Sequence, residues 1–185
     1  MLSSNLKISA VAALLWLQLP LFAAEPYVGV GAGAGFVTLN NLRTGNANAC
    51  SGLASNLLLG LPINAHLALE AEYASIGKFI DPSVSMNITS VGVSAVGILP
   101  LGNSKFSLRW KGGIASTTAT ATPMAGYSLT GSESTDKTGI TLGFSAQYEM
   151  SPNVSLRLSA DSYEFAAATA SGRVATLNAL GIFRF

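Results

Sequence analysis

The sequence predicts an all-β protein, folded as an eight-stranded antiparallel up-and-down transmembrane β-barrel. Eight stretches alternate between apolar residues and small or polar ones, as strands do when only one face meets lipid. Long and short connections alternate between these stretches, which is typical of barrels with external loops and periplasmic turns. Only 10% of the 185 residues are charged and 49% are hydrophobic, whereas about 25% are charged in an ordinary soluble domain.

The last stretch, residues 177–185, gives the clearest indication of a membrane barrel. One of its faces carries Leu177, Ala179, Gly181, Phe183 and Phe185. An exposed apolar edge promotes aggregation of a soluble domain, whereas a closed barrel has no edge and places aromatic residues at the membrane interface. We therefore expect a closing strand here, and we expect Gly181, Phe183 and Phe185 to be the insertion signal that the barrel assembly machinery reads.

Residues 1–24 have the pattern of a secretory signal peptide. Lys7 supplies a weakly basic start, residues 8–22 form an apolar core, and cleavage is expected after Ala23 or after Ala24, which are both small. The alternative is a membrane-anchoring helix. Residues 25–185 are then the outer-membrane β-barrel domain, with nine basic residues (ten less Lys7) and nine acidic ones.

The other strands and their connections follow from the same alternation. Strands are expected at residues 26–37, 53–61, 65–78, 86–99, 105–115, 138–150 and 154–165. Tight turns are expected at 62–64, 100–104 and 151–153, and external loops at 38–52, around Asp81-Pro82, at 116–137 and at 166–172. Each strand is then near the 9–11 residues that cross a bilayer, and an even strand number leaves both termini in the periplasm.

The predicted faces favour lipid outside and polar groups inside. The rows expected to meet lipid include Leu57, Leu59, Leu67, Leu69, Val91, Val93, Trp110, Ile140, Leu142, Leu156 and Leu158. Charged residues fall on the opposite faces, together with Gly and Ser. A soluble lipocalin-like barrel would have the reverse pattern, with its apolar residues inside.

The inward charges form the main candidate site. Glu70, Glu72, Arg109, Lys111 and Asp161 are expected at similar heights near the middle of the barrel. Glu149, Arg157 and Arg184 are expected lower, near the periplasmic end. Opposite charges in a narrow lumen would pair, because an unpaired buried charge is costly. The network is expected to be a structural plug or, alternatively, a gate in a narrow pore.

Several segments together resemble the OmpA-like transmembrane-domain family of outer-membrane proteins. They are YVGVGAGAGF, LALEAEYASIGKF, LPLGNSKFSLRWKGGIA, QYEMSPNVSLRLSADSYEF and ALGIFRF, which span essentially the whole mature chain. The resemblance implies an eight-stranded barrel with a structural, adhesive or weakly pore-forming role. It also implies lumen Glu–Lys/Arg pairs that fill the barrel. We expect the barrel alone, without the periplasmic peptidoglycan-binding domain of larger relatives.

Enzymatic and cofactor chemistry have little support in the sequence. His66 is the single histidine, expected to point inward beside a periplasmic turn, whereas lipid-modifying barrel enzymes act near the outer leaflet. One histidine cannot form a multi-histidine metal site. Gly29-x-Gly31-x-x-Ala34 imitates a dinucleotide fingerprint, but no strand precedes it and no helix follows. Cys50, the only cysteine, is expected in the first external loop as a free thiol or an intermolecular link.

The sequence therefore predicts an outer-membrane barrel with a structural or surface-interaction, adhesin-like role. A narrow gated channel for ions or small solutes is the first alternative, and a lipid-modifying enzyme is the second. The expected partners are outer-membrane lipid, the assembly machinery and an unidentified extracellular ligand, with residues 116–137 as its best contact surface. We expect a monomer that is not an enzyme, carries no cofactor and binds no nucleic acid.

Overall fold

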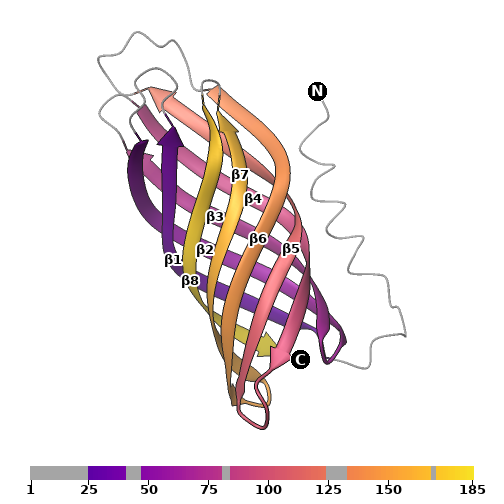
Figure 1. Ribbon diagram of the computed structural model, residues 1–185. Helices are drawn as coiled ribbons and strands as arrows, with labels where there is room; N and C mark the ends of the chain where they lie inside the picture. Colours follow the sequence, from indigo (N-terminus) through magenta and orange to yellow (C-terminus); the bar gives the residue numbers. More distant parts are fainter. Residues whose placement is uncertain (1–24, 41–46, 81–83, 124–132, 168–169) are drawn as a thin grey trace.

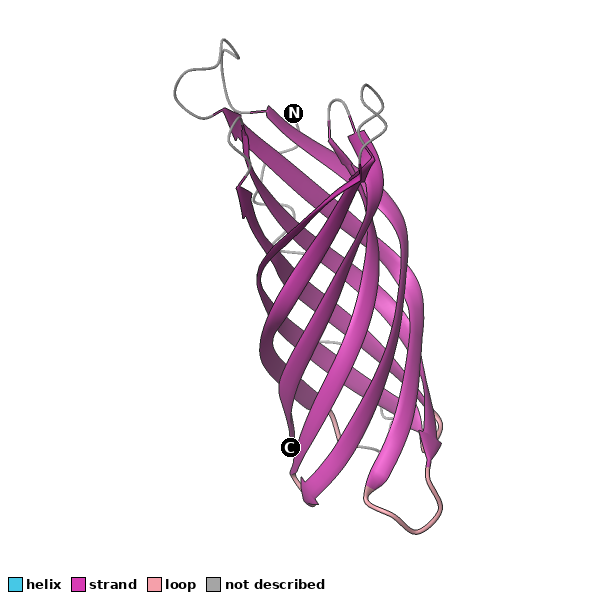
Figure 2. Cartoon of the chain, turned by 60° about the vertical axis from the view of Figure 1, so that its left-hand side comes forward, coloured by secondary structure: helices cyan, strands magenta, loops and turns pink. Residues whose placement is uncertain are grey.

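The computed structural model describes residues 25–40, 47–80, 84–123, 133–167 and 170–185, and these form one closed barrel (Figures 1 and 2). The strands are β1 (Tyr27–Asn40), β2 (Ala47–Asn64), β3 (Leu67–Ile80), β4 (Val84–Pro100), β5 (Phe106–Pro123), β6 (Glu133–Ser151), β7 (Val154–Ala167) and β8 (Ala170–Arg184). Each pairs antiparallel with the next, and β1 closes the barrel on β8, with Tyr27 opposite Arg184. The predicted fold class is confirmed. The described residues contain no helix that is long and apolar enough to cross a membrane.

The barrel has a turn end and a loop end. At the turn end lie residues 65–66, 101–105 and 152–153, together with the C-terminus (Figure 1). The predicted turn at 62–64 is wrong, because these residues continue β2 and the chain reverses at Ala65 and His66. The β2–β3 register shifts between Pro62 and Asn64, next to a residue that has no amide hydrogen for the ladder.

The strands have 14 to 19 residues, and all but β3, which has the predicted 14, are longer than predicted. Much of the expected loops at 38–52, 116–137 and 166–172 belongs to strands, so only 41–46, 124–132 and 168–169 separate the strands there. The Asn and Gly content of 38–52 and the Ser, Thr, Ala and Gly content of 116–137 favour loops, yet β-branched Thr on alternate positions of 116–122 also favours a strand. Residues 1–24, 81–83 and 124–132 lie outside the described part of the chain. They include the expected signal peptide, Asp81-Pro82 and the middle of the expected contact surface at 116–137.

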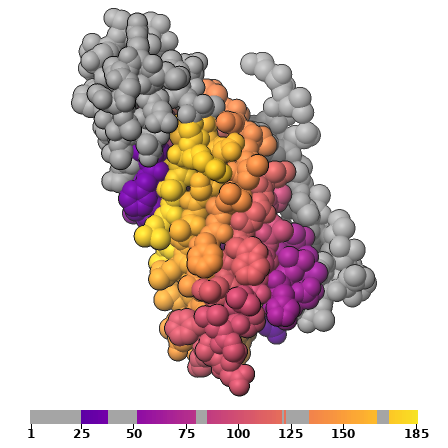
Figure 3. Space-filling view, viewed as in Figure 1, coloured from indigo at the N-terminus to yellow at the C-terminus, as the bar shows by residue number. Residues whose placement is uncertain are grey.

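The outer face of the barrel carries an apolar band, as predicted. Exposed large side chains include Leu57, Leu59, Leu69, Tyr73, Val91, Val93, Trp110, Ile114, Ile140, Leu142, Phe144, Leu156, Leu158, Leu177 and Phe183. On the side seen in Figure 3, broad aromatic side chains of the β5–β6 region (pink and orange) stand on this surface. Along β5 the band runs from Phe106 to Ile114, about 27 Å of strand at roughly 3.4 Å per residue. With a tilt near 40° this is roughly 21 Å of height, close to the band of a bilayer-spanning barrel.

Above the band the outer face becomes polar on three adjacent strands. Ser116 of β5 lies beside Thr138 of β6 in the register, and the next outward positions on both strands are also polar. The described strands therefore continue beyond the apolar band at the loop end.

The interior has a different character at different heights. The prediction of a polar lumen is correct near the middle, but an apolar cluster occupies much of the loop-end half. Its members are Val37, Ala74, Ile76, Phe79, Met86, Ile88, Ala115, Ala119, Tyr163, Phe165 and Val174. A smaller apolar cluster, Tyr27, Leu58, Leu180 and Ile182, lies nearer the turn end.

Two ladders end before their strands do at the loop end. The β2–β3 ladder stops at Ser55 and Ser75, and the β6–β7 ladder stops at Thr141 and Tyr163. The strands stay close beyond these points, since a Cβ on Gly52 of β2 would lie 3.1 Å from the carbonyl oxygen of Lys78 of β3. In β3, Gly77 has φ +129° at the register shift with β4 and permits the bend.

Candidate functional site: a charge network across the barrel interior

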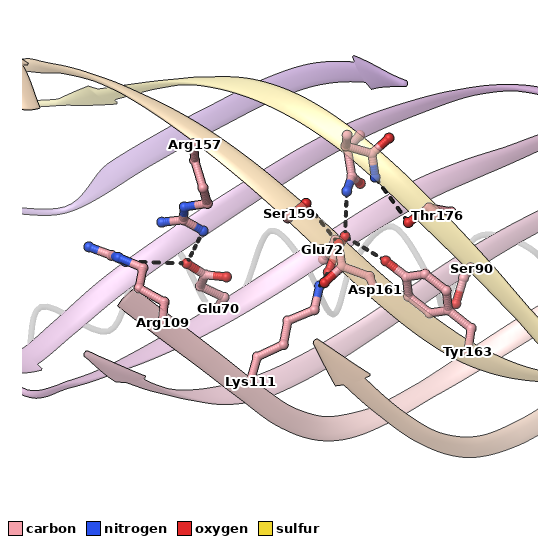
Figure 4. Close-up of polar contacts among 12 residues, drawn as sticks. Glu70, Glu72, Ser90, Arg109, Lys111, Arg157, Ser159, Asp161, Tyr163 and Thr176 are labelled. Atoms are coloured by element: carbon pink, nitrogen blue, oxygen red, sulfur yellow. Dashed lines mark hydrogen bonds and ion pairs between the residues drawn. The ribbon is translucent and has the colours of Figure 1, made fainter. Parts of the chain in front are cut away.

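Six ionisable side chains meet near the middle of the lumen, and three strands supply them (Figure 4). β3 contributes two acids, β5 two bases, and β7 one of each. The set is Glu70, Glu72, Arg109, Lys111, Arg157 and Asp161. All of them lie on inward-facing positions, and their side chains are 10% exposed or less. Three carboxylates therefore face three cations, and the formal charges balance.

The turn-side half of this network is centred on Glu70. Its Oε1 accepts hydrogen bonds from Arg157 Nη1 at 2.7 Å and from Tyr27 Oη at 2.6 Å. Arg109 Nη1 lies 3.8 Å from the same oxygen and donates to Tyr27 Oη at 3.3 Å. Both guanidinium carbons lie near the Tyr27 ring, 5.7 Å (Arg109) and 5.6 Å (Arg157) from its centroid, within range of a cation–π attraction.

The loop-side half is centred on Lys111. Its Nζ donates to Glu72 Oε2 and lies 2.9 Å from Asp161 Oδ1, so one ammonium bridges carboxylates of two strands. Glu72 Oε1 also accepts from Asn56 Nδ2 at 2.7 Å and Tyr163 Oη at 2.8 Å.

Asp161 has a further donor in Ser159, whose Oγ lies 2.9 Å from Asp161 Oδ2. Buried charges are tolerated when they are both paired and hydrogen-bonded, and both carboxylates of this half meet that condition.

Little space remains between these side chains. All of them except Arg109 line a cavity with a volume of about 10 Å³, and Asn56, Leu58, Ser159 and Leu180 complete its wall. Such a volume holds about one water molecule. The network thus joins β3, β5 and β7 across the lumen, and the cavity that the described residues leave between its side chains is too small for a hydrated ion.

The predicted grouping of the charges needs one correction. Arg157 was expected lower, with Glu149 and Arg184, but it binds Glu70 directly. The error follows from the misplaced turn at 62–64: with β3 starting at Leu67, Glu70 is three residues into its strand, and Arg157 is three residues into β7. Glu149 and Arg184 do pair near the turn end, with Arg184 Nη2 2.7 Å from Glu149 Oε1, on a more exposed surface.

Two other sequence expectations are also wrong in position. His66 does not point inward; it is exposed in the β2–β3 turn, with Nδ1 3.3 Å from the carbonyl oxygen of Ile98. Cys50 lies in β2 opposite Val37 rather than in a loop. Among the described residues, no group of His, Cys, Asp and Glu could hold a metal ion.

The sequence reasoning missed the uncharged members of the network. Tyr27, Asn56, Ser159 and Tyr163 supply its neutral donors, and all four lie on inward-facing positions. The alternation of inward and outward residues along each strand could have identified these donors, because Tyr27 shares its face with the first-strand glycines and Tyr163 shares its face with Asp161. Gly60, opposite Tyr27 in the register, leaves room for the ring, since a Cβ there would lie 2.0 Å from Tyr27 Cζ.

The chain matches known proteins in sequence pattern and in fold. The family described as "Outer membrane protein beta-barrel domain" matches residues 9–183. Neisserial surface protein A has a similar structure, with TM-score 0.66 and 19% identity over 86% of this chain and 97% of that one. The attachment invasion locus protein Ail of Yersinia pestis has TM-score 0.58 and 18% identity, covering 88% and 99%.

The outer membrane protein OprG of Pseudomonas aeruginosa is also similar, with TM-score 0.61 and 11% identity over 89% and 97% of the two chains. At such identities the likeness shows a shared fold. No curated protein matches the chain by sequence.

Proposed function

Because the chain belongs to the outer membrane protein beta-barrel domain family, we propose that it is a membrane-embedded scaffold which presents its loop end at the cell surface for contact with other molecules. The filled lumen is the observation that carries this proposal. It favours a structural or surface-interaction role over that of a pore.

Two layers oppose passage of ions. The charge network spans the lumen around a cavity of about 10 Å³, and the apolar cluster occupies much of the loop-end half above it. Eight strands enclose an interior that side chains can fill. An ion would have to displace the bridging Lys111 and then cross an apolar layer in which it loses its hydration, at a large energetic cost.

The loop end supports the surface role. The described strands continue past the apolar band with polar outward side chains. The loop ends of these strands therefore lie outside the lipid-covered part of the barrel. Two of the similar structures are named as a surface protein and an attachment invasion locus protein, and an adhesin-like role for this chain is proposed in keeping with those names.

Further parts of the proposal concern export and partners. Residues 1–24 act as the signal peptide, and both ends of the mature barrel lie in the periplasm. Outer-membrane lipid surrounds the band as the main partner, around a monomer. Phe183 on the closing strand β8 and Phe185 directly after it are exposed, and with Gly181 they form the signal for the barrel assembly machinery. No catalytic role is assigned to His66, which is exposed in the β2–β3 turn.

Planar-bilayer conductance of the refolded barrel tests the proposal. The expected result is a silent membrane, with folding of the inserted protein confirmed by a heat-dependent shift in gel mobility. Discrete conductance steps that change with Glu72→Gln or Lys111→Met would instead support the narrow gated channel, because both variants alter the layer that an ion must cross. Conductance steps unchanged by both variants would mean that ions bypass the network.

A further inference from the structure

A surface of short polar side chains covers one wall of the barrel directly above the apolar band. We call it the hydroxyl face. It consists of the outward positions at the loop ends of three adjacent strands: Ser85, Asn87 and Thr89 of β4, Ser116, Thr118, Thr120 and Thr122 of β5, and Ser134, Asp136 and Thr138 of β6. All ten are exposed or half-exposed.

The hydroxyl face is a regular array, because the three strands are in register. Thr118 lies between Thr89 and Asp136, and Thr120 lies between Asn87 and Ser134. Neighbouring strands are about 4.8 Å apart, and successive outward residues of one strand are about 6.8 Å apart. Thr118 Oγ1 donates to Asp136 Oδ1 at 2.6 Å, and the Thr120 and Ser134 oxygens are 3.4 Å apart. Hydrogen bonds within the sheet thus hold part of this array in place.

The chemistry of the hydroxyl face excludes several kinds of partner. It has no aromatic or large aliphatic side chain, whereas stable protein interfaces are centred on such residues. Asp136 is its one ionisable group, and Lys78 of β3 borders it opposite Asn87. Phosphate is bound best by Arg and Lys clusters. The surface is therefore suited to a neutral partner that both donates and accepts hydrogen bonds.

The position of the hydroxyl face indicates which kind of neutral partner would contact it. It continues the lipid-facing surface of the same strands: Val91 of the band lies opposite Ser116, and Val93 lies opposite Ile114 one level below. Molecules whose acyl chains cover the band must carry their headgroups past this array. In the outer leaflet those molecules are glycolipids, and their headgroups are oligosaccharides.

We propose that the hydroxyl face binds the neutral sugars of the outer-leaflet glycolipid. The inference rests on the proposed function in one respect, that the loop end faces the cell exterior. Sugar hydroxyls match an array of Ser, Thr and Asn, and a sheet that is already ordered loses little entropy on binding. Each contact is weak, but the glycolipid is held beside the array by its own acyl chains, which raises its effective concentration.

Solution NMR of the barrel in two kinds of nanodisc tests the proposal. One contains glycolipid with its complete oligosaccharide, and the other contains glycolipid truncated to lipid A and its innermost acidic sugars. The expected difference is a set of amide shifts concentrated at residues 85–89, 116–122 and 134–138. The double variant Thr118→Val/Thr120→Val keeps the side-chain shape and should remove most of these shifts, whereas Ser162→Ala, on the outward face of β7, should retain them.

The melting temperature gives a second readout. The complete glycolipid should raise the melting temperature of the wild type above its value in truncated glycolipid by about 2 °C or more, and this gain should disappear in the double variant. An equal gain in the double variant would overturn the proposal, as would shifts centred on Glu164 and Arg173, because the sugars that differ between the two nanodiscs would then contact charged residues outside the hydroxyl face. Shifts at the turn end would contradict the assumed orientation and hence the proposed function, so the two failures are distinguishable.

Discussion

Replacing Lys111 with Met should cost much of the stability of the barrel. The ammonium of Lys111 bridges Glu72 and Asp161, and its side chain is only 10% exposed. Without it, two carboxylates remain buried with no cation between them. Removing one partner of a buried ion pair costs about 3–5 kcal/mol, and neutral donors such as Tyr163 and Ser159 offset only part of that loss. Urea titration of the folded protein in lipid vesicles, followed by tryptophan fluorescence, measures the change.

The same substitution at Lys137 is the matched control. Lys137 Nζ is 3.8 Å from Glu164 Oε2, and both side chains are about one-third exposed (36% and 30%), so Lys137→Met should cost about 1 kcal/mol or less. Adding Asp161→Asn to Lys111→Met should recover part of the stability, because it removes one uncompensated charge. If Lys111→Met costs no more than Lys137→Met, or if Asp161→Asn makes it worse, the network does not stabilise the barrel as described.

Three further predictions concern packing and orientation. Gly60→Ala should destabilise the barrel by about 1–3 kcal/mol, because a Cβ at this position would overlap the Tyr27 ring. Gly112→Ala is the control. A Cβ there would meet nothing closer than 3.8 Å, so the urea midpoint should change little. Gly77→Ala should cost more than about 1 kcal/mol in the same titration, because φ of +129° strains any side-chain-bearing residue, and an unchanged midpoint would show that the bend relaxes. Trp110, 51% exposed on the band, should be quenched by lipids brominated on their acyl chains, whereas quenching by aqueous acrylamide alone would place it in water.

The alternation of side chains was sufficient to predict the fold class, the strand number and the lipid face. Side-chain parity along a strand is fixed by its geometry, so Trp110 and Val93 were assigned outward and Glu70 inward correctly. The strand ends could not be predicted in the same way. Ser116 to Thr122 alternate Thr with small residues, a composition shared by loops, and only pairing with β4 and β6 makes them strands.

The network was partly predictable for a similar reason. Parity identified all six of its charges as inward-facing, but their heights depend on where each strand begins, and the turn at 62–64 was misplaced. The apolar loop-end cluster was not predicted. Phe79 lies inward because Gly77 shifts the register of β3. A lone glycine in a strand can mark such a bulge, but side-chain alternation by itself does not show it.

Three properties of the barrel can be tested together: lipid covers the apolar band, side chains fill the lumen, and the hydroxyl face contacts water or sugar headgroups. A spin-label scan of β5 tests all three at once, with single cysteines at residues 106–122 other than Arg109 and Lys111, on a Cys50→Ala background. Labels at Phe106, Trp110 and Ile114 should relax with oxygen, labels at Thr118 and Thr122 with a water-soluble nickel complex, and inward labels such as those at Ala115 and Ala119 with neither. Strong relaxation of the inward labels by the nickel complex would reveal a water-filled channel and contradict the account.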